Sequence, residues 1–325
     1  ALDSKLLFKY LPNILTLATI GLLISTTVIA VFLYYGINHS GFPFIAALLT
    51  GVVISATDPV AVVSQLKQLK APADLNVLIE GESLFNDATA IVLFGIILSI
   101  ALGQSEPDVT SALMTFSKVF FGGIIIGSLL GYIAALIVRL INVSVPHIVV
   151  ITLLLAYGTF YVAEHLLHVS GIVAVMFSAL IFKKSVHSLL AHVYTGLHSV
   201  WESLGFIANI FVFVLLGLVV SLNMFTEMWL AILLSICGAF IARIAAVYIS
   251  TWLNHFTLGQ PINPKYPPIM IWGGLRGAVT IALVLSLPTE LPYWWTIQSI
   301  GFGIVIFTLV VQATTTPILV RKLKI

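Results

Sequence analysis

Charge is scarce in this sequence: only 8% of its 325 residues are charged, whereas soluble domains carry roughly 25%. Because 60% of the residues are hydrophobic, no soluble core could bury so much apolar chain, and a soluble globular protein is excluded. Cysteine occurs once, at Cys237, which excludes a disulfide framework and a cysteine-based metal site. The net charge of +2 does not indicate nucleic-acid binding, because the basic residues lie at the ends of apolar stretches. We expect no nucleic-acid partner and no cofactor.

The apolar residues form long stretches, most of them about 20 residues long, which is the length that a helix needs to cross a bilayer. The alternating stretches of about ten residues that indicate an outer-membrane β-barrel do not occur. We therefore predict an all-α polytopic membrane protein with about ten transmembrane helices in a lipid bilayer. The stretches lie at about residues 11–36, 42–66, 77–102, 113–138, 146–168, 170–183, 198–221, 228–252, 268–288 and 297–320.

Lysine and arginine are distributed unequally between alternate loops. Lys67, Lys70, Arg139 and Lys183 lie in loops on one side of the membrane, and acidic residues such as Glu164 gather on the other side. Because cytoplasmic loops carry the excess of Lys and Arg, this asymmetry places both termini in the cytoplasm. It also agrees with an even number of membrane crossings.

Four ionisable residues lie well inside the apolar stretches: Asp58, Asp87, Arg243 and Arg276, with Glu82 about one turn from Asp87. A charge near the bilayer centre costs at least ~2.5–3.5 kcal/mol on insertion scales. Such residues face the protein interior or a water-filled cavity, and they usually mark an ion or proton path. The alternative is that they form purely structural ion pairs.

The second stretch contains Thr57-Asp58-Pro59, which is typical of a helix start, with an Asp cap followed by Pro at the first helical position. We therefore expect a half-helix to begin inside the membrane, where its freed carbonyl groups can bind a cation. At 1.5 Å per residue, Asp58 and Asp87 both lie ~12–15 Å from the cytoplasmic edge of their antiparallel helices. An ordinary proline kink is the alternative, but it does not explain the Asp.

The ninth stretch repeats this feature, because Gly273, Gly274 and Gly277 interrupt it at its middle beside Arg276. Interrupted helices in corresponding places of two halves indicate a transporter's binding site. If helices one to three repeat as helices eight to ten, the second helix corresponds to the ninth. We predict an inverted repeat in which the two breaks cross.

The third stretch, EGESLFNDATAIVLF, supplies oxygen ligands. Ser83 and Asp87 are four residues apart and share one helix face, while Glu82 and Asn86 share the neighbouring face. Hard oxygen ligands suit hard cations, and two nearby carboxylates raise one another's proton affinity, whereas a bound cation lowers it. The residues therefore predict competition between a proton and a monovalent cation. Asp87 and Asp58 are the candidate carboxylate ligands for the transported cation.

Three motifs, ATDPVAV at 56–62, EGESLFNDA at 80–88 and GGLRGAV at 273–279, resemble those of NhaP-type sodium/proton antiporters in the cation:proton antiporter-1 family. The resemblance implies a homodimeric, multi-pass protein of the cell membrane that moves between inward and outward states. It implies a core bundle at about 11–102 and 228–320, and linking and dimerisation helices at about 113–221. It further implies that the family's first three helices are absent from this chain.

The resemblance also implies residue roles in transport. Asp87 would bind sodium and a proton alternately, and Thr57, Asp58 and Ser83 would be its coligands. Asn86 precedes Asp87 where electrogenic relatives have a second Asp, so electroneutral one-for-one exchange is expected.

Three further residues would have structural roles by the same resemblance. Glu82 would pair with Arg243, and we interpret Arg276 as a residue that binds helix-end carbonyl groups.

Several alternatives remain at this point. A potassium/proton antiporter is the main one, since the sequence does not separate sodium, lithium and potassium. An intramembrane aspartyl protease would need a Gly-x-Gly-Asp motif, but Asp87 follows Phe-Asn. A channel would not need paired carboxylates, and no stretch is typical of a carbonyl-ring filter. We expect a transporter that serves pH homeostasis, not an enzyme.

Overall fold

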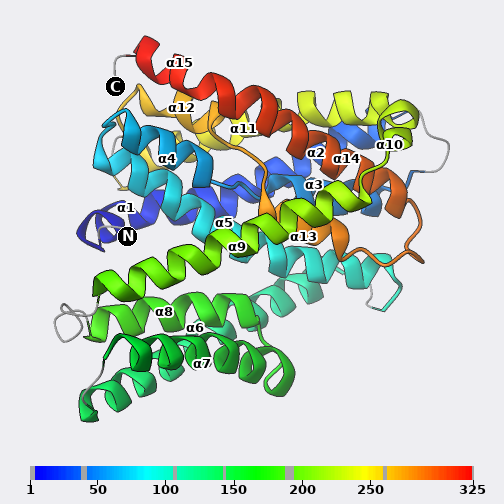
Figure 1. Cartoon of the computed structure of the whole chain (residues 1–325). Coiled ribbons are helices and arrows are strands. Elements are labelled where there is room, and N and C mark those ends of the chain that lie inside the picture. Colours follow the sequence, from blue (N-terminus) through cyan, green and yellow to red (C-terminus); the bar gives the residue numbers. More distant parts are fainter. Residues whose placement is uncertain are drawn as a thin grey trace. The chain divides into compact units, whose positions relative to one another are not determined.

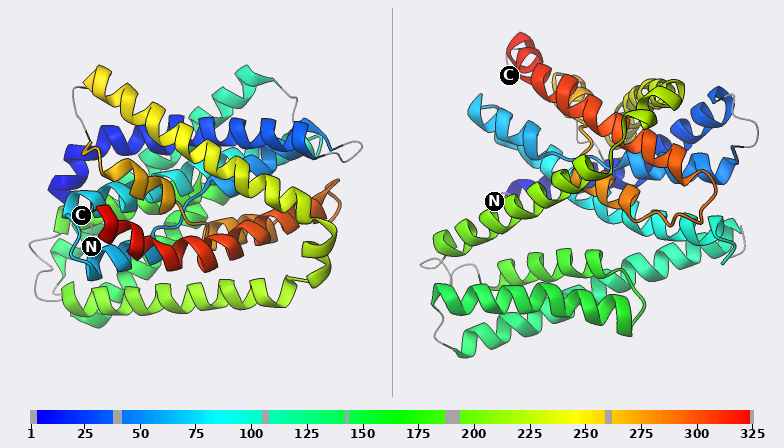
Figure 2. Two further views of the ribbon diagram at one scale, coloured as in Figure 1. Left: turned by 90° about the horizontal axis from the view of Figure 1, so that it is seen from above. Right: turned by 45° about the vertical axis from the view of Figure 1, so that its right-hand side comes forward.

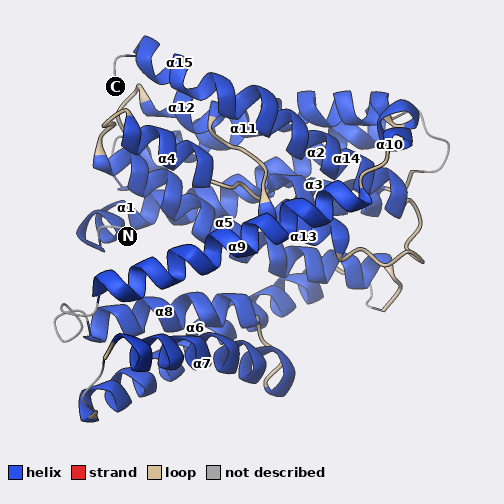
Figure 3. Cartoon of the chain, in the orientation of Figure 1, coloured by secondary structure: helices blue, strands red, loops and turns tan. Residues whose placement is uncertain are grey.

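The computed structural model describes residues 4–37, 42–104, 108–141, 144–186, 194–258 and 262–323, and these ranges contain helices but no strand (Figure 3). The predicted all-α class is thus confirmed. Eight helices in these ranges are long and apolar enough to cross a membrane, judged by length and composition. Two of the ten predicted segments fall outside this set for physical reasons. The sixth forms a helix of only 16 residues, and the ninth is broken into helices of 7 and 8 residues. The second segment is also broken, but Phe44–Gln68 is counted as one span.

The elements follow one another along the chain with short connections, and the label η marks a π-helical turn. They are α1 (Ser4–Thr16), η1 (Leu17–Gly21), α2 (Leu22–Gly36), α3 (Phe44–Ser55), α4 (Val60–Gln68), α5 (Ala73–Ala101), α6 (Val109–Leu140), α7 (Val145–Tyr161), η2 (Val162–Leu166), α8 (Gly171–Val186), α9 (Tyr194–Val219), α10 (Leu222–Glu227), α11 (Trp229–Leu258), α12 (Tyr266–Trp272), α13 (Ala278–Leu285), α14 (Trp294–Phe307), η3 (Thr308–Gln312) and α15 (Ala313–Leu323). The short helix α10 lies between two predicted segments and was not expected.

The chain divides into two compact units, one formed by residues 1–105 and 212–325 and the other by residues 106–211. The first unit joins helices from both ends of the sequence around one apolar core. Ile29 of α2, Val52 of α3, Ile281 of α13 and Phe302 of α14 are all fully buried in that core. This unit therefore depends on contacts between segments more than 200 residues apart along the chain.

Two helices of the first unit are interrupted, and their interruptions meet (Figure 1). One break separates α3 from α4, and the other separates α12 from α13. The backbone N–H of Asp58 in the first break donates a hydrogen bond of 2.8 Å to the carbonyl of Leu275 in the second. Both breaks lie where the sequence predicts them. The first follows from Pro59, which has no N–H and disfavours a helical conformation of Asp58. The second contains Gly273, Gly274 and Gly277.

The second unit is held together by close packing of α6 against α8, and the right-hand view of Figure 2 shows its green helices packed together. Gly123, Gly127 and Gly131 lie at four-residue intervals on one face of α6. A side chain at Gly127 would collide with the backbone carbonyl of Ala174 in α8. The small residues thus permit the close backbone approach that is typical of membrane helices. The predicted use of residues 113–221 in dimerisation stays a prediction.

Candidate ion-binding site

The crossing brings together four helix ends, each with unpaired backbone groups. The carboxyl ends of α3 and α12 present carbonyl oxygens and a partial negative charge, whereas the amino ends of α4 and α13 present N–H groups and a partial positive charge. In a membrane interior these groups need partners from the protein itself. The charged residues predicted from the sequence supply those partners.

Asp58 caps both amino ends with one carboxylate. Its Oδ1 accepts a hydrogen bond of 3.0 Å from the Val60 N–H at the start of α4. Its Oδ2 accepts one of 3.3 Å from the Ala278 N–H at the start of α13. A side chain at Gly277 would overlap this carboxylate, so the position requires glycine. The helix begins at Val60, one residue later than the sequence suggested.

Two arginines bind the carboxyl ends. The Nε of Arg276 donates to the carbonyl of Ile54 at the end of α3, and its Nη1 donates to the carbonyl of Gly274. The Nε and Nη2 of Arg243 donate to the carbonyl of Met270 in α12, at 3.1 and 3.0 Å. Each guanidinium therefore sits at the negative end of a half-helix, where a cation is favourable.

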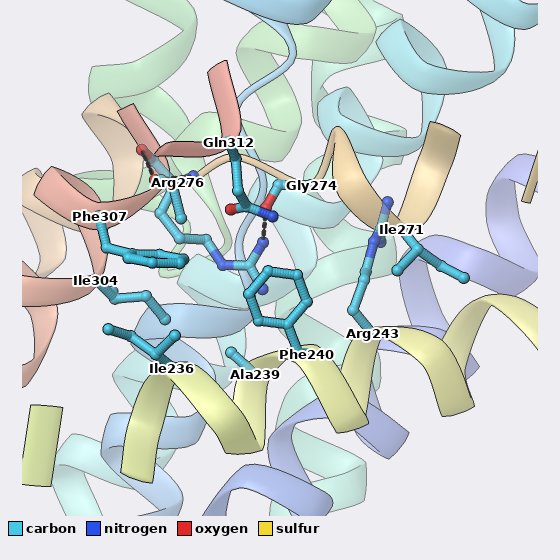
Figure 4. Close-up of a pocket in the computed structure, with 11 residues that line it drawn as sticks. Ile236, Ala239, Phe240, Arg243, Ile271, Gly274, Arg276, Ile304, Phe307 and Gln312 are labelled. Carbon is cyan, nitrogen blue, oxygen red and sulfur yellow. Dashed lines mark hydrogen bonds between the residues drawn. The ribbon is translucent and has the colours of Figure 1, made fainter. Parts of the chain in front are cut away.

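Glu82 forms an ion pair with Arg243 in the interior. Both carboxylate oxygens of Glu82 accept hydrogen bonds from Arg243, one of them 2.9 Å long. Glu82 is 1% exposed and Arg243 is 7% exposed. Figure 4 shows Arg243, from α11, and Arg276 at a small cavity of about 10 Å³. All ionisable residues predicted in the membrane thus belong to one region of the first unit.

Asp87 differs from the other two carboxylates at the crossing. Its Oδ1 and the Oδ1 of the neighbouring Asn86 are buried and have no hydrogen-bond partner among the described residues. The Nδ2 of Asn86 donates to the carbonyl of Ser55, at 3.4 Å. A buried oxygen without a partner is unfavourable by about 1–3 kcal/mol. A bound proton or cation would remove this penalty.

The predicted coligands lie on α5 and at the first break. Ser83 lies one helical turn before Asp87 on α5, and its hydroxyl donates to the carbonyl of Thr57. Asp58 follows Thr57 in the first break. The sequence left open whether Thr57 contributes its carbonyl or its hydroxyl, and the carbonyl is the group that meets Ser83 here. Carboxylate, hydroxyl, amide and carbonyl oxygens together suit a small hard cation.

Some residues of the site were missed from the sequence. Thr280 donates to the carbonyl of Val53, at 3.2 Å, and Thr308 and Gln312 bind the backbone of the second break. Each is a polar residue within an apolar stretch, and that signal could have identified them. Their partners are distant in the sequence, so the spacing alone could not.

Comparisons with known proteins all find sodium/proton exchangers or antiporters. The family described as sodium/hydrogen exchanger, transmembrane, matches residues 1–322. The Na(+)/H(+) antiporter NhaH of Halobacillus dabanensis is 32% identical over 323 residues, covering 98% of this chain and 77% of that protein. The Na(+)/H(+) antiporter NhaP of Pseudomonas aeruginosa is 34% identical over 316 residues, covering 94% and 73%.

A solved structure shows the same fold. The sodium proton antiporter MjNhaP1 of Methanocaldococcus jannaschii matches with a TM-score of 0.83 and 23% identity, over 98% of this chain and 80% of that chain.

Proposed function

This chain belongs to the sodium/hydrogen exchanger family, and on that premise we propose that it is a secondary active antiporter that exchanges sodium for protons. The relatives described above carry the name of sodium/proton antiporters, which favours sodium over potassium. An intramembrane protease is not favoured, because the family is one of transmembrane exchangers.

One observation carries the proposal: Asp87 is the carboxylate at the crossing with an unpartnered oxygen. Both carboxylate oxygens of Glu82 accept hydrogen bonds from Arg243. Both carboxylate oxygens of Asp58 accept hydrogen bonds from backbone N–H groups. The Oδ1 of Asp87 has no partner among the described residues. Asp87 is therefore the group that is free to accept either a proton or a sodium ion. Thr57, Asp58, Ser83 and Asn86 supply the oxygens around it.

The charges at the crossing support one-for-one exchange. Three carboxylates, of Glu82, Asp58 and Asp87, face two guanidiniums, of Arg243 and Arg276, so the ionised group carries one net negative charge. A proton on Asp87 or a sodium ion beside it brings the sum to zero in either case. The loaded site therefore crosses the membrane with the same charge in both directions, and the exchange moves no net charge.

The two units have different roles in this proposal. The unit of residues 1–105 and 212–325 carries the ion, and the unit of residues 106–211 forms the contact between two copies in a homodimer. The protein resides in the cell membrane with its carboxyl terminus in the cytoplasm, where the basic loops lie. Sodium extrusion coupled to proton entry would serve pH homeostasis.

The test uses the chain reconstituted in proteoliposomes with a proton gradient and an internal pH dye. Sodium, lithium and potassium are added in turn to wild-type protein, to Asp87→Asn and to Glu80→Gln. Glu80 lies on the same helix as Asp87 and forms a surface ion pair with Lys67, so its variant is the control. We expect sodium-driven proton flux in wild type and Glu80→Gln and none in Asp87→Asn. Flux near the wild-type rate in folded Asp87→Asn would refute the assignment.

A further inference from the structure

The last membrane-spanning segment, Trp294–Leu323, contains a π-helical turn, η3, beside the second break. Thr308 and Gln312 are its first and last residues, and each is 3% exposed. π-helical turns inside α-helices are rare and are frequently found at functional sites. A buried threonine and a buried glutamine in an apolar helix also need hydrogen-bond partners.

Both side chains find their partners on the unwound backbone between α12 and α13. The Thr308 hydroxyl accepts a hydrogen bond of 3.1 Å from the N–H of Arg276. The Nε2 of Gln312 donates one of 3.0 Å to the carbonyl of Trp272. Figure 4 shows Gln312 beside Gly274 and next to the Arg276 guanidinium. The two residues thus bind the break at both of its ends.

The same break holds Asp58 in place. The carbonyl of Leu275 accepts a hydrogen bond from the N–H of Asp58. The N–H of Ala278 donates a hydrogen bond to the Oδ2 of Asp58. Any shift of the segment 272–278 therefore moves the Asp58 carboxylate. We infer that Thr308 and Gln312 are positioning residues for the ion site, which act through this segment and do not touch the ion. The inference rests on the proposed function, because the site that they position is the proposed sodium site.

A purely structural role is the competing explanation, and the same segment of the chain provides matched controls. Gln298 of α14 is 6% exposed, and its Nε2 donates a 3.2 Å hydrogen bond to the carbonyl of Val284 in the last turn of α13. Thr316 is fully buried, and its hydroxyl donates to the carbonyl of Gln312 within its own helical segment. Neither control binds the break.

The experiment measures the half-saturating sodium concentration and its pH profile in proteoliposomes. The variants are Thr308→Val and Gln312→Met, with Gln298→Met and Thr316→Val as controls and Thr308→Ser as the rescue that keeps the hydroxyl. We expect Thr308→Val and Gln312→Met to raise the half-saturating concentration roughly tenfold, the lower end of the range for residues that orient metal ligands. Gln298→Met, Thr316→Val and Thr308→Ser should stay within about twofold of wild type.

Two results would overturn the inference. One is an unchanged half-saturating concentration in folded Thr308→Val and Gln312→Met; the other is an equal increase in the controls. If Gln312→Met does not fold, Thr308→Val and Thr308→Ser carry the test between them. An absence of sodium-driven flux in wild type would instead contradict the proposed function, so the two failures are distinguishable.

Discussion

Replacing Glu82 by glutamine should destabilise the protein strongly, because it removes one partner of a buried ion pair. The carboxylate and the Arg243 guanidinium form two hydrogen bonds in an environment where Glu82 is 1% exposed. After the substitution Arg243 keeps its hydrogen bonds to the Met270 carbonyl, but its charge has no counterion beside it.

The magnitude follows from this environment. Removing one partner of a buried ion pair lowers the free energy of unfolding by about 3–5 kcal/mol. The same substitution two residues earlier, Glu80→Gln, removes a 2.7 Å pair with Lys67 whose side chains are 21% and 57% exposed. Exposed ion pairs contribute only about 0–1 kcal/mol to the free energy of unfolding. Because both glutamates lie on α5 and both become glutamine, the difference between the variants reports burial and pairing alone.

The assay is thermal unfolding of the purified protein in detergent, followed for wild type, Glu82→Gln, Glu80→Gln and the double variant Glu82→Gln/Arg243→Gln. We expect the melting temperature to fall by several degrees in Glu82→Gln and to remain near wild type in Glu80→Gln. The double variant should be more stable than Glu82→Gln, because the unpaired charge is gone. A wild-type melting temperature in Glu82→Gln, together with lost transport, would refute the structural role and indicate that Glu82 binds the ion directly.

Two further predictions concern glycines. Gly277→Ala should abolish exchange, because its methyl group would overlap the Asp58 carboxylate that caps both half-helices. Gly205→Ala is the control, because its methyl group would meet open space, and this variant should transport at the wild-type rate. Proteoliposome flux assays compare the two variants, and normal flux in Gly277→Ala would contradict the geometry of the crossing. Gly127→Leu should lower the melting temperature, because the side chain would be driven into the Ala174 carbonyl; an unchanged melting temperature would mean that α6 and α8 do not pack as closely as described.

The sequence was informative where the cause of the structure is local. Pro59, directly after Asp58, and three glycines around Arg276 are local signals that disfavour a continuous helix, so both breaks could be predicted. Proline alone is not decisive, because Pro12 and Pro317 lie inside unbroken helices. The pairing of Glu82 with Arg243, 161 residues apart, came only from the resemblance to a family. The crossing of the two breaks was predicted, but the capping of α13 by Asp58 was not, because it depends on how the atoms of two segments more than 200 residues apart pack against each other.

The π-helical turn at 308–312 was also invisible in the sequence. Its residues continue an apolar stretch without proline or a glycine pair, and the turn is apparent only once the helix packs against the second break. Thr308 and Gln312 stand out in the sequence as polar residues in an apolar stretch, but their contact with the second break does not. The division into two units likewise depends on packing, and it falls within α9 and not at a loop.

The central claim is that Asp87 alone changes partner during transport, so that one sodium ion is exchanged for one proton. Its most direct test is the initial rate of sodium-driven proton flux in proteoliposomes that carry a potassium/valinomycin potential of either sign. The account predicts the same initial rate at positive, zero and negative potential. A rate that rises with one polarity and falls with the other would show that a second charge moves, and it would contradict the claim that Asp87 alone changes partner.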